Sequence, residues 1–247
     1  PHAWYNTKGS LDVFVAVLDT GVDYNHPDLQ VNCIPGFNFI DNNADPMDKD
    51  GHGTHCAGII SAIGNNSIGV AGVSWNSKIM PIKVLGEDGG DVSTIISGIQ
   101  LASNKGARII SMSLGMYSYS QAFKDAIDQS KALFICSAGN DGVDTDRVPH
   151  YPSGYDSYNI LSVGASNEYD FPAVFSIYGA SNYGKSTVDV FAPGNNILST
   201  TPDNTYSNMS GTSMATPMVS GIAALILSME PTLTNSEIKT AIMTTVD

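Results

Sequence analysis

Four polar residues stand where the chain leaves an apolar run or opens a helical pattern. Asp19 ends the run VAVLD, His52 lies in DGHGTH, Asn140 ends SAGN, and Ser213 lies in SGTSMATP. A serine hydroxyl attacks well only when a base takes its proton, and a histidine base works best when a buried carboxylate fixes its tautomer. Asp19, His52 and Ser213 would fill these three roles.

The same reaction needs donors for the negative oxygen that forms on an attacked carbonyl. The side-chain amide of Asn140 and the backbone N–H of Ser213, which we place at the start of a helix, are suitable donors. The four residues together predict acyl transfer through a serine nucleophile. Taken separately, Ser213 as a helix cap, Asp19 as a turn cap and His52 as a satisfied polar residue are equally good interpretations.

The elements that would position these residues are short apolar runs, rich in β-branched side chains and each followed by Gly, Asn or Asp. Such runs are typical of strands buried on both faces. We expect these strands at residues 13–18, 79–85, 108–112, 133–136, 160–163 and 188–191. Because the carboxyl ends of parallel strands carry the chemistry in such sheets, Asp19 and Asn140 should reach the same edge.

Helical patterns lie between several of these runs, at residues 91–106, 120–132 and 234–243. Asp91 or Ser93 would cap the first and Gly106 would end it, while Thr234 and Glu237 have capping-box spacing in the third. Alternating strands and helices predict an α/β domain, with a parallel sheet between two layers of helices.

Composition excludes several classes of function. Of 247 residues 42% are hydrophobic, enough for one substantial core, and 24 acidic residues outnumber 11 basic ones. An acidic chain lacks the footprint of a nucleic-acid or anionic-membrane partner, and no run approaches the roughly 18 apolar residues of a membrane span. Cys33, Cys56 and Cys136 form no Cys-x-x-Cys pair, so buried thiols are favoured over a disulfide framework, although one disulfide stays open.

The motifs DTGVD, HGTH, SAGN and GTSMATP, in the order Asp, His, Ser, resemble the subtilisin-like serine proteases, the subtilases of peptidase family S8. The likeness extends over nearly the whole chain, and thermitase-like and protozoan subtilisin-like members are the most similar. It implies a three-layer α/β sandwich with a mostly parallel sheet of about seven strands. It also implies endopeptide hydrolysis through an acyl-enzyme, with Asp19, His52 and Ser213 as the triad and Asn140 in the oxyanion hole.

The resemblance further implies that a substrate peptide pairs as a strand between Asp88-Gly89-Gly90 and Ser113-Leu114-Gly115. The first side-chain pocket would be surrounded by Leu114, Ala138, Gly139 and Asp141. The pocket for the fourth residue before the cleavage site would be lined by Val92, Ile95 and Leu114. Asp141 would let the first pocket accept basic as well as apolar side chains, unless it is only an exposed loop acid.

Calcium is the ion that the resemblance implies, without an organic cofactor. The first site would use carbonyls of Ile63, Ile68 and Val70, the side chain of Asn66, and Asp28. Oxygen donors of this mixed kind suit a hard cation. A second, weaker set in the Asn/Asp-rich stretch comprises Asn38, Asp41, Asn43 and Asp45, where Asn replaces Asp at two positions.

Other implied properties concern the whole protein. We expect residues 1–247 to be a single peptidase domain, clipped at both ends relative to the family and lacking the prodomain that would inhibit the site. Secretion, or residence in a secretory compartment, and a monomeric state are further expectations. Cys56 resembles the buried free thiol of thermitase-like members, which predicts mercurial sensitivity. His55 would support its helix, and Pro217 would be tolerated near the first turn of the helix of Ser213.

Three other enzyme classes fit less well. GTSMA nearly matches the elbow of α/β-hydrolases, but no histidine follows Ser213. His52 and His55 lack the glutamate and the spacing of a zinc hydrolase. The acid-active sedolisins would need other residues at His52 and Asn140. A non-enzymatic domain kept for binding is the remaining alternative, although every proposed catalytic position is filled.

Overall fold

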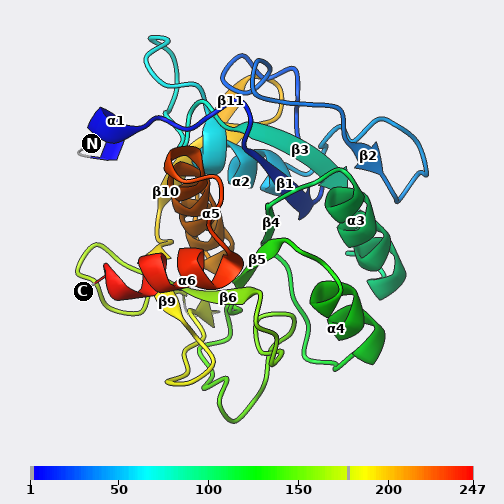
Figure 1. The fold of residues 1–247 in the computed structure, drawn as a ribbon, viewed down its shortest axis with the longest axis vertical. Coiled ribbons are helices and arrows are strands. Elements are labelled where there is room, and N and C mark those ends of the chain that lie inside the picture. The colour runs from blue at the N-terminus through cyan, green and yellow to red at the C-terminus, as the bar shows by residue number, and fades with distance from the viewer. Residues whose placement is uncertain (1–2, 177–178, 247) are drawn as a thin grey trace.

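A computed structural model describes residues 3–176 and 179–246. Its centre is a seven-stranded sheet in the order β2-β3-β1-β4-β5-β6-β9, and every neighbouring pair is parallel (Figure 1). The strands are β1 (Phe14–Asp19), β2 (Phe37–Asn38), β3 (Lys78–Lys83), β4 (Ile109–Met112), β5 (Leu133–Ser137), β6 (Ile160–Ser166) and β9 (Val190–Pro193). The expected α/β architecture is confirmed, although β2 is too short to be visible as a pattern.

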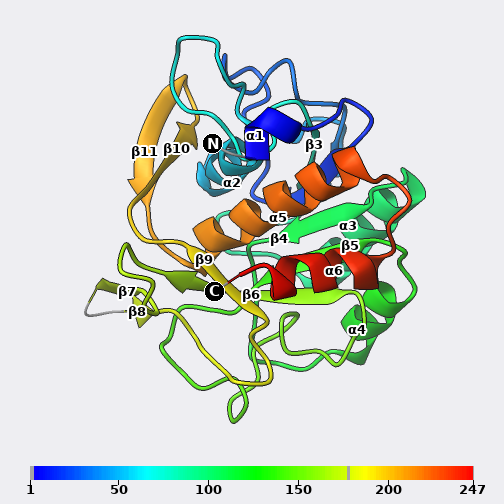
Figure 2. The same ribbon diagram turned by 60° about the vertical axis from the view of Figure 1, so that its left-hand side comes forward.

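Each face of the sheet has its own core because successive side chains of a strand point to opposite faces. Val15 and Val17 of β1 pack with α2 (His52–Ser61), α5 (Thr212–Met229) and α6 (Asn235–Thr244). Ala16 and Leu18 pack with α3 (Val92–Asn104) and α4 (Gln121–Asp128) on the other face. Figure 2 shows α5 and α6 in front of the sheet and α3 and α4 behind it. A short helix, α1 (Ala3–Asn6), precedes the sheet.

Several helix ends follow local sequence, although α4 ends at Asp128, before the expected residue 132. The capping box of Thr234 and Glu237 is present, and Gly106, with φ +85°, follows the last turn of α3. Asp91 stands at the N-cap of α3, but its side chain makes no capping hydrogen bond. The predicted start of the second helix is confirmed, because the Ser120 hydroxyl accepts from the N–H of Phe123.

Helix α5 is buried for most of its length. Its 18 residues have a mean hydropathy of 1.4, so by length and composition it could cross a membrane, contrary to the sequence expectation. However, 67% of the helix is buried within the protein, where it contacts α2 and several strands of the sheet. Burial of most of the helix surface is the usual reason for such a composition in a core helix.

Two antiparallel pairs lie outside the main sheet and were not predicted. They are β10 (Ile197–Thr201) with β11 (Thr205–Met209), and β7 (Val174–Ser176) with β8 (Gly179–Ala180). The turn of the first pair places Asp203 and Asn204 at φ 61° and 60°. Asp and Asn tolerate this left-handed backbone, so the turn carried a signal that sequence reasoning missed.

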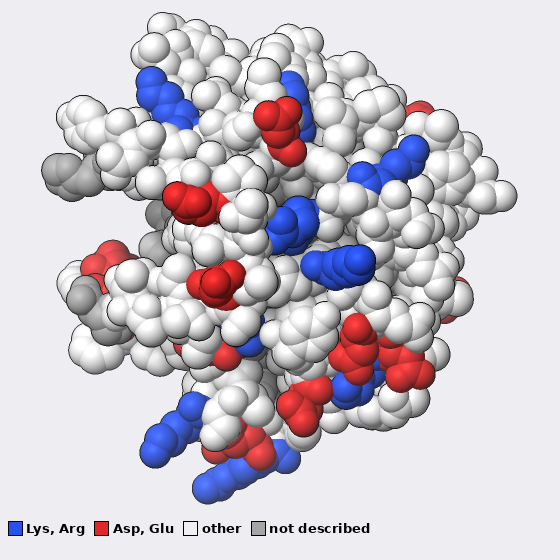
Figure 3. Space-filling view, in the orientation of Figure 1, with Lys and Arg blue, Asp and Glu red and all other residues white. Residues whose placement is uncertain are grey.

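The surface shown in Figure 3 is mostly uncharged, with acidic and basic groups scattered among each other. On that face charges of opposite sign are interspersed, and no large patch of one sign is visible. Cys33, Cys56 and Cys136 are all free, so the expectation of unpaired thiols is confirmed.

Candidate active site

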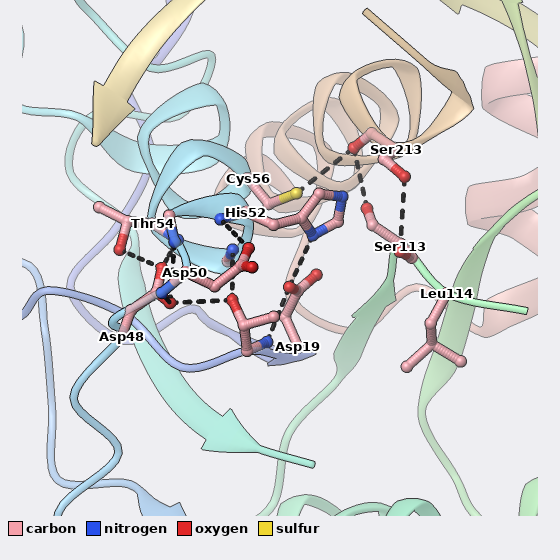
Figure 4. A network of polar contacts seen from close by, with 12 residues as sticks. Asp19, Asp48, Asp50, His52, Thr54, Cys56, Ser113, Leu114 and Ser213 are labelled. Atoms are coloured by element: carbon pink, nitrogen blue, oxygen red, sulfur yellow. Dashed lines mark hydrogen bonds and ion pairs between the residues drawn. The ribbon is translucent and has the colours of Figure 1, made fainter. Parts of the chain in front are cut away.

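Asp19 and His52 meet where β1 ends and α2 begins. The Asp19 carboxylate is buried, and its Oδ1 lies 2.7 Å from Nδ1 of His52, whose side chain is 28% exposed (Figure 4). This close approach depends on Gly53, because a Cβ there would lie 2.1 Å from the carbonyl oxygen of Gly21 and 3.0 Å from Cβ of Asp19. The glycine of the HGTH motif therefore allows the helix to start against the end of the strand.

The electrostatics of this pair favour a charged imidazole. Asp19 is the largest cause that raises the pKa of His52, to about 9, while burial opposes it and the nearby Asp50 and Asp48 add to it. With the proton on Nδ1 shared with the carboxylate, Nε2 is left free to take a second proton. The Oδ2 atom of Asp19 is buried and finds no hydrogen-bond partner among the residues that the structure describes.

A second buried carboxylate, Asp48, connects the end of β1 to the start of α2. Sequence reasoning missed this residue. The residue is 2% exposed. Its Oδ1 accepts from the Thr20 hydroxyl at 3.0 Å and from the N–H of Asp50 and Gly51, and its Oδ2 accepts from the N–H and hydroxyl of Thr54. Asp48 thus links the residue after Asp19 to the first turn of the helix that carries His52.

Ser213 stands one residue later in its helix than expected. Helix α5 begins at Thr212, and its N-cap is Gly211, so Ser213 is the second helical residue and not the cap. Its backbone N–H makes no hydrogen bond within the helix at this position, as is usual for the first turn. Ser213 therefore presents both its N–H and its hydroxyl at the positive end of the helix dipole.

Pro217 lies in the second turn of α5, farther from the helix start than expected. Because proline has no N–H, the carbonyl of Ser213 loses its helical partner. Two side chains replace it: the Ser113 hydroxyl donates to this carbonyl at 2.9 Å and the Cys56 thiol at 3.4 Å (Figure 4). The proline thus lets residues from two other elements hold the backbone of Ser213.

The hydroxyl of Ser213 is held loosely by comparison. Its Oγ donates to the carbonyl of Ser113 at 3.5 Å, the limit for a hydrogen bond. Among residues 3–176 and 179–246, no hydrogen bond joins this hydroxyl to His52, although Figure 4 shows the ring facing Ser213. Catalytic hydrogen bonds are often long before a substrate binds, so this geometry is compatible with a nucleophile and its base.

Asn140 follows β5 at the same edge of the sheet. Its Oδ1 accepts from both the N–H and the hydroxyl of Thr212, at 2.8 and 2.9 Å. The anchored oxygen leaves the amide NH₂ directed away from Thr212 and available as a donor. An N–H donor from Asn140 and the N–H of Ser213 therefore lie close together in space, although the two residues are far apart in the sequence.

The predicted substrate-binding residues belong to loops that follow several strands of the sheet and to the start of α3. Ser113, Leu114 and Gly115 follow β4, and Leu114 points away from Ser213 (Figure 4). Ile95 and Leu114 belong to one hydrophobic cluster, against which Val92 packs. Residues of the other edge are exposed: Gly89 pairs with Gly86 in a tight bridge, and Gly90 follows. Ala138 and Gly139 are buried, and Asp141 is exposed.

His55 and Cys56 are buried beside the pair. Nε2 of His55 contacts the carbonyls of Ile197 and Ser207 at 3.0 and 3.1 Å, so this residue ties α2 to the β10–β11 pair, as its supporting role requires. Asp19, His52 and Cys56 place ligand atoms within 4.8 Å of one another. Burial raises the pKa of the Cys56 thiol well above its ordinary value, so it is a protonated donor at neutral pH.

Of the first set of predicted calcium ligands, Asn66 and the backbone of Val70 contact the carboxylate of Asp28. Its Oδ1 lies 2.5 Å from Nδ2 of Asn66, and its Oδ2 accepts from the N–H of Val70 and the Tyr206 hydroxyl. Within the second set, Asn38 donates to Asp41 at 2.9 Å and to the carbonyl of Asp45 at 3.1 Å. The oxygen of Asn43 accepts from the N–H of Asp45.

Comparisons with known proteins agree with this architecture. The profile of the Subtilase family matches residues 10–247. A thermophilic serine proteinase of Bacillus sp. (strain AK1) is 42% identical over 250 residues, all of this chain, which spans 59% of that relative's length. Thermitase of Thermoactinomyces vulgaris is 39% identical over 251 residues, with 85% of its length covered. The crystal structure of a cold-adapted subtilisin-like serine proteinase superposes with a TM-score of 0.84 at 35% identity, covering 97% of this chain and 83% of that one.

Proposed function

We propose, from the premise that the chain belongs to the subtilase family and is a subtilisin-like serine endopeptidase, that it cleaves protein substrates through an acyl-enzyme on Ser213. His52 is the base and Asp19 its partner. The observation that carries this assignment is the 2.7 Å contact between Nδ1 of His52 and the buried Asp19, at a corner that also holds Ser213.

In the first step, Nε2 of His52 takes the proton of the Ser213 hydroxyl as its Oγ attacks the carbonyl carbon of the peptide bond. The resulting imidazolium is stabilised by Asp19, which keeps its own charge. His52 then gives the proton to the leaving amine, and the C–N bond breaks. A water molecule, deprotonated by the same histidine, releases the acid product and restores the serine.

Two N–H groups stabilise the oxyanion that forms in each half of the reaction. They are the amide of Asn140 and the backbone N–H of Ser213, both fixed before substrate arrives. The anchor of Asn140 is Thr212, whose N–H and hydroxyl hold its Oδ1. Preorganised donors of this kind lower the barrier because they need no reorganisation when charge develops.

The substrate would lie extended between residues 88–90 and 113–115, paired through its backbone. Ile95, Leu114 and Val92 would receive the fourth side chain before the cleaved bond, since they already belong to one apolar cluster in which Val92 is only partly buried. Residues 138–141 would flank the first pocket. Pairing through the main chain supports action on many protein sequences.

Calcium fits the first predicted site. Asp28 is fully buried, and in the part of the chain that the structure describes no lysine or arginine pairs with it. Turning the Asn66 amide by half a turn would bring its oxygen beside the carboxylate, and heavy-atom positions alone do not distinguish the two orientations. The carbonyls of Ile63, Ile68 and Val70 would complete the set. A bound ion would neutralise Asp28 and fix the loop.

The second predicted site fits a cation less well. Asn38 directs its NH₂ at Asp41 and at the carbonyl of Asp45, so a donor stands where a cation would need an acceptor. Asp45 also accepts from the Tyr24 hydroxyl at 2.8 Å. These hydrogen bonds close the loop without an ion, and we assign it no step.

Calcium at the first site is tested by thermal unfolding of the full-length protein in calcium and in EDTA. Chelation should lower Tm, because an ion that binds only the folded state stabilises it. Asp28→Asn should lower Tm and abolish the difference, whereas Asp41→Asn should preserve it. Equal Tm values in both buffers would contradict the site. A prodomain inhibitor, secretion, a single domain and a monomeric state remain predictions.

The catalytic proposal is tested with a fluorophosphonate probe on the full-length protein, and the adduct is mapped by mass spectrometry. Labelling confined to Ser213 and lost in His52→Ala supports an activated nucleophile. A folded protein that is not labelled would contradict the protease mechanism and support the alternative of a domain kept for binding.

A further inference from the structure

The slot between residues 113–115 and 138–139 is where the proposed function places the side chain before the cleaved bond, and this inference rests on that function. A histidine occupies part of the slot. A Cβ added to Gly115 would lie 2.1 Å from Cε1 of His150 and 2.5 Å from its Nε2. A Cβ added to Gly139 would lie 3.1 Å from both Cδ2 and Nε2 of the same ring. The imidazole therefore touches both walls.

His150 is a fixed part of the structure. It is 6% exposed, and its Nδ1 lies 3.2 Å from the Ser153 hydroxyl. The next residue, Tyr151, pairs with Met116 through two backbone hydrogen bonds of 2.7 Å. Burial lowers the pKa of His150, so the ring is neutral at neutral pH. A ring held in this way narrows the slot in every state of the enzyme that keeps these contacts.

A second pair of side chains joins the two walls on the outer side of the ring. Tyr117, two residues after Gly115, donates its hydroxyl to the carboxylate of Asp141, two residues after Gly139. The Tyr117 ring meets His150 edge to face, with centroids 5.3 Å apart. The backbone N–H of Asp141 is held in turn by Asn182 at 3.0 Å. The bridge and the imidazole thus form one connected barrier.

We propose that His150, with the Tyr117–Asp141 bridge, closes the first pocket so that the enzyme cleaves after small side chains in preference to aromatic or basic ones. A side chain the size of alanine or serine needs none of the space that the imidazole fills. An aromatic or a lysine side chain would have to displace a buried ring from contact with two backbone segments, which close packing opposes.

The bridge also changes the expected role of Asp141. A free carboxylate at the rim would attract lysine or arginine, which was the expectation from sequence. Here the carboxylate already accepts from Tyr117, and its exposed position lets water screen it. Asp141 therefore acts first as an anchor for Tyr117, and contributes little to the binding of a cation.

The test uses peptide substrates that differ only in the residue before the cleaved bond, Ala, Phe or Lys, and measures kcat/KM. For the unaltered enzyme we expect Ala to exceed Phe and Lys by about tenfold or more, the effect typical of a pocket that excludes a few carbon atoms. His150→Ala should raise the Phe-to-Ala ratio by about tenfold. Tyr117→Phe should raise the ratio of kcat/KM for the Lys peptide to that for the Ala peptide by about threefold, because the carboxylate of Asp141 is no longer bound by Tyr117.

Tyr119→Phe is the matched control, because its hydroxyl contacts Gln121 and its loss should leave all ratios unchanged. A preference of the unaltered enzyme for Phe or Lys would overturn the inference, whether or not His150→Ala folds. So would a folded His150→Ala that labels with the fluorophosphonate probe but keeps the original ratios. Absence of labelling in the unaltered enzyme would overturn the proposed function, and this inference with it.

Discussion

The two halves of the candidate active site are built differently. On the Asp19 side, carboxylate, imidazole and helix start are joined by short hydrogen bonds, including the 2.7 Å contact to His52. On the Ser213 side, the backbone is held by Ser113 and Cys56, but the hydroxyl itself has only a 3.5 Å contact. The base is thus fixed in advance, while the nucleophile keeps rotational freedom.

The difference follows from what each half must do. His52 has to hold one tautomer through several proton transfers, and a fixed carboxylate ensures this. The Ser213 oxygen has to move from its resting position to the substrate carbon, so a strong hydrogen bond in the free enzyme would oppose the reaction. Substitutions in the two halves should therefore affect catalytic rate and stability to different extents.

The largest effect is expected at the nucleophile. Ser213→Ala should reduce kcat by at least about 10⁴-fold and leave Tm nearly unchanged, because its hydroxyl stabilises little. Steady-state kinetics and calorimetry measure both. Ser210→Ala, in the same segment, is the control for activity. Residual activity within tenfold of the original would mean that another group performs the attack.

A smaller effect is expected from the carboxylate behind the base. Asp48→Asn keeps the size of the side chain but loses charge-assisted acceptors for Thr20 and Thr54, at a cost of about 2 kcal/mol in unfolding free energy. We expect kcat/KM to fall about tenfold as His52 loses its fixed position. Asp170→Asn, on an exposed turn, is the matched control. If the unfolding free energy and kcat/KM of Asp48→Asn were both unchanged, the hydrogen bonds of Asp48 would not be what positions His52.

The pH profile sharpens the comparison further. Asp19 raises the pKa of His52, and His52 must be neutral to act as a base. We therefore expect kcat/KM to rise with pH, with the midpoint of the rise above 6.5, the ordinary pKa of a histidine. Asp48→Asn should shift this acidic limb of the pH profile to lower pH, since one charge that favours the imidazolium is lost. The stabilisation from the pair should be complete below about pH 6.5 and decline through about pH 9. If the acidic limb of the pH profile were the same in Asp48→Asn, Asp48 would not contribute to the pKa of His52.

The smallest effect is expected where the serine backbone is held. Ser113→Ala removes the 2.9 Å hydrogen bond to the Ser213 carbonyl and leaves the Cys56 thiol as its partner. We expect a loss of about 1 kcal/mol in stability and a decrease of a few-fold in kcat. Ser97→Ala, which removes a similar bond on the exposed side of α3, should leave kcat unchanged. A decrease as large as that of Ser213→Ala would assign Ser113 a direct part in catalysis.

Local sequence predicted the elements whose signals are local. Short apolar runs predicted β1 and β3 to within two residues, and Thr234 with Glu237 predicted the start of α6. The start of α5 was wrong by one residue, because the Gly-Thr-Ser run contains several possible caps. Strand β2 was missed because it has only two residues and pairs with β3, whereas the hairpin of β10 and β11 was missed although its turn carries a local signal.

The sequence by itself determined the α/β order and the types of residue at the ends of β1 and β5 and at the start of α2, because strand and helix periodicity and glycine breaks act over a few residues. Only the tertiary structure decided which of them touch. The contacts of Asp48 with Thr20, of Ser113 with the carbonyl freed by Pro217, and of Tyr117 with Asp141 join residues 24 to 100 positions apart. Such contacts are set by how the layers pack, and packing depends on the whole core at once.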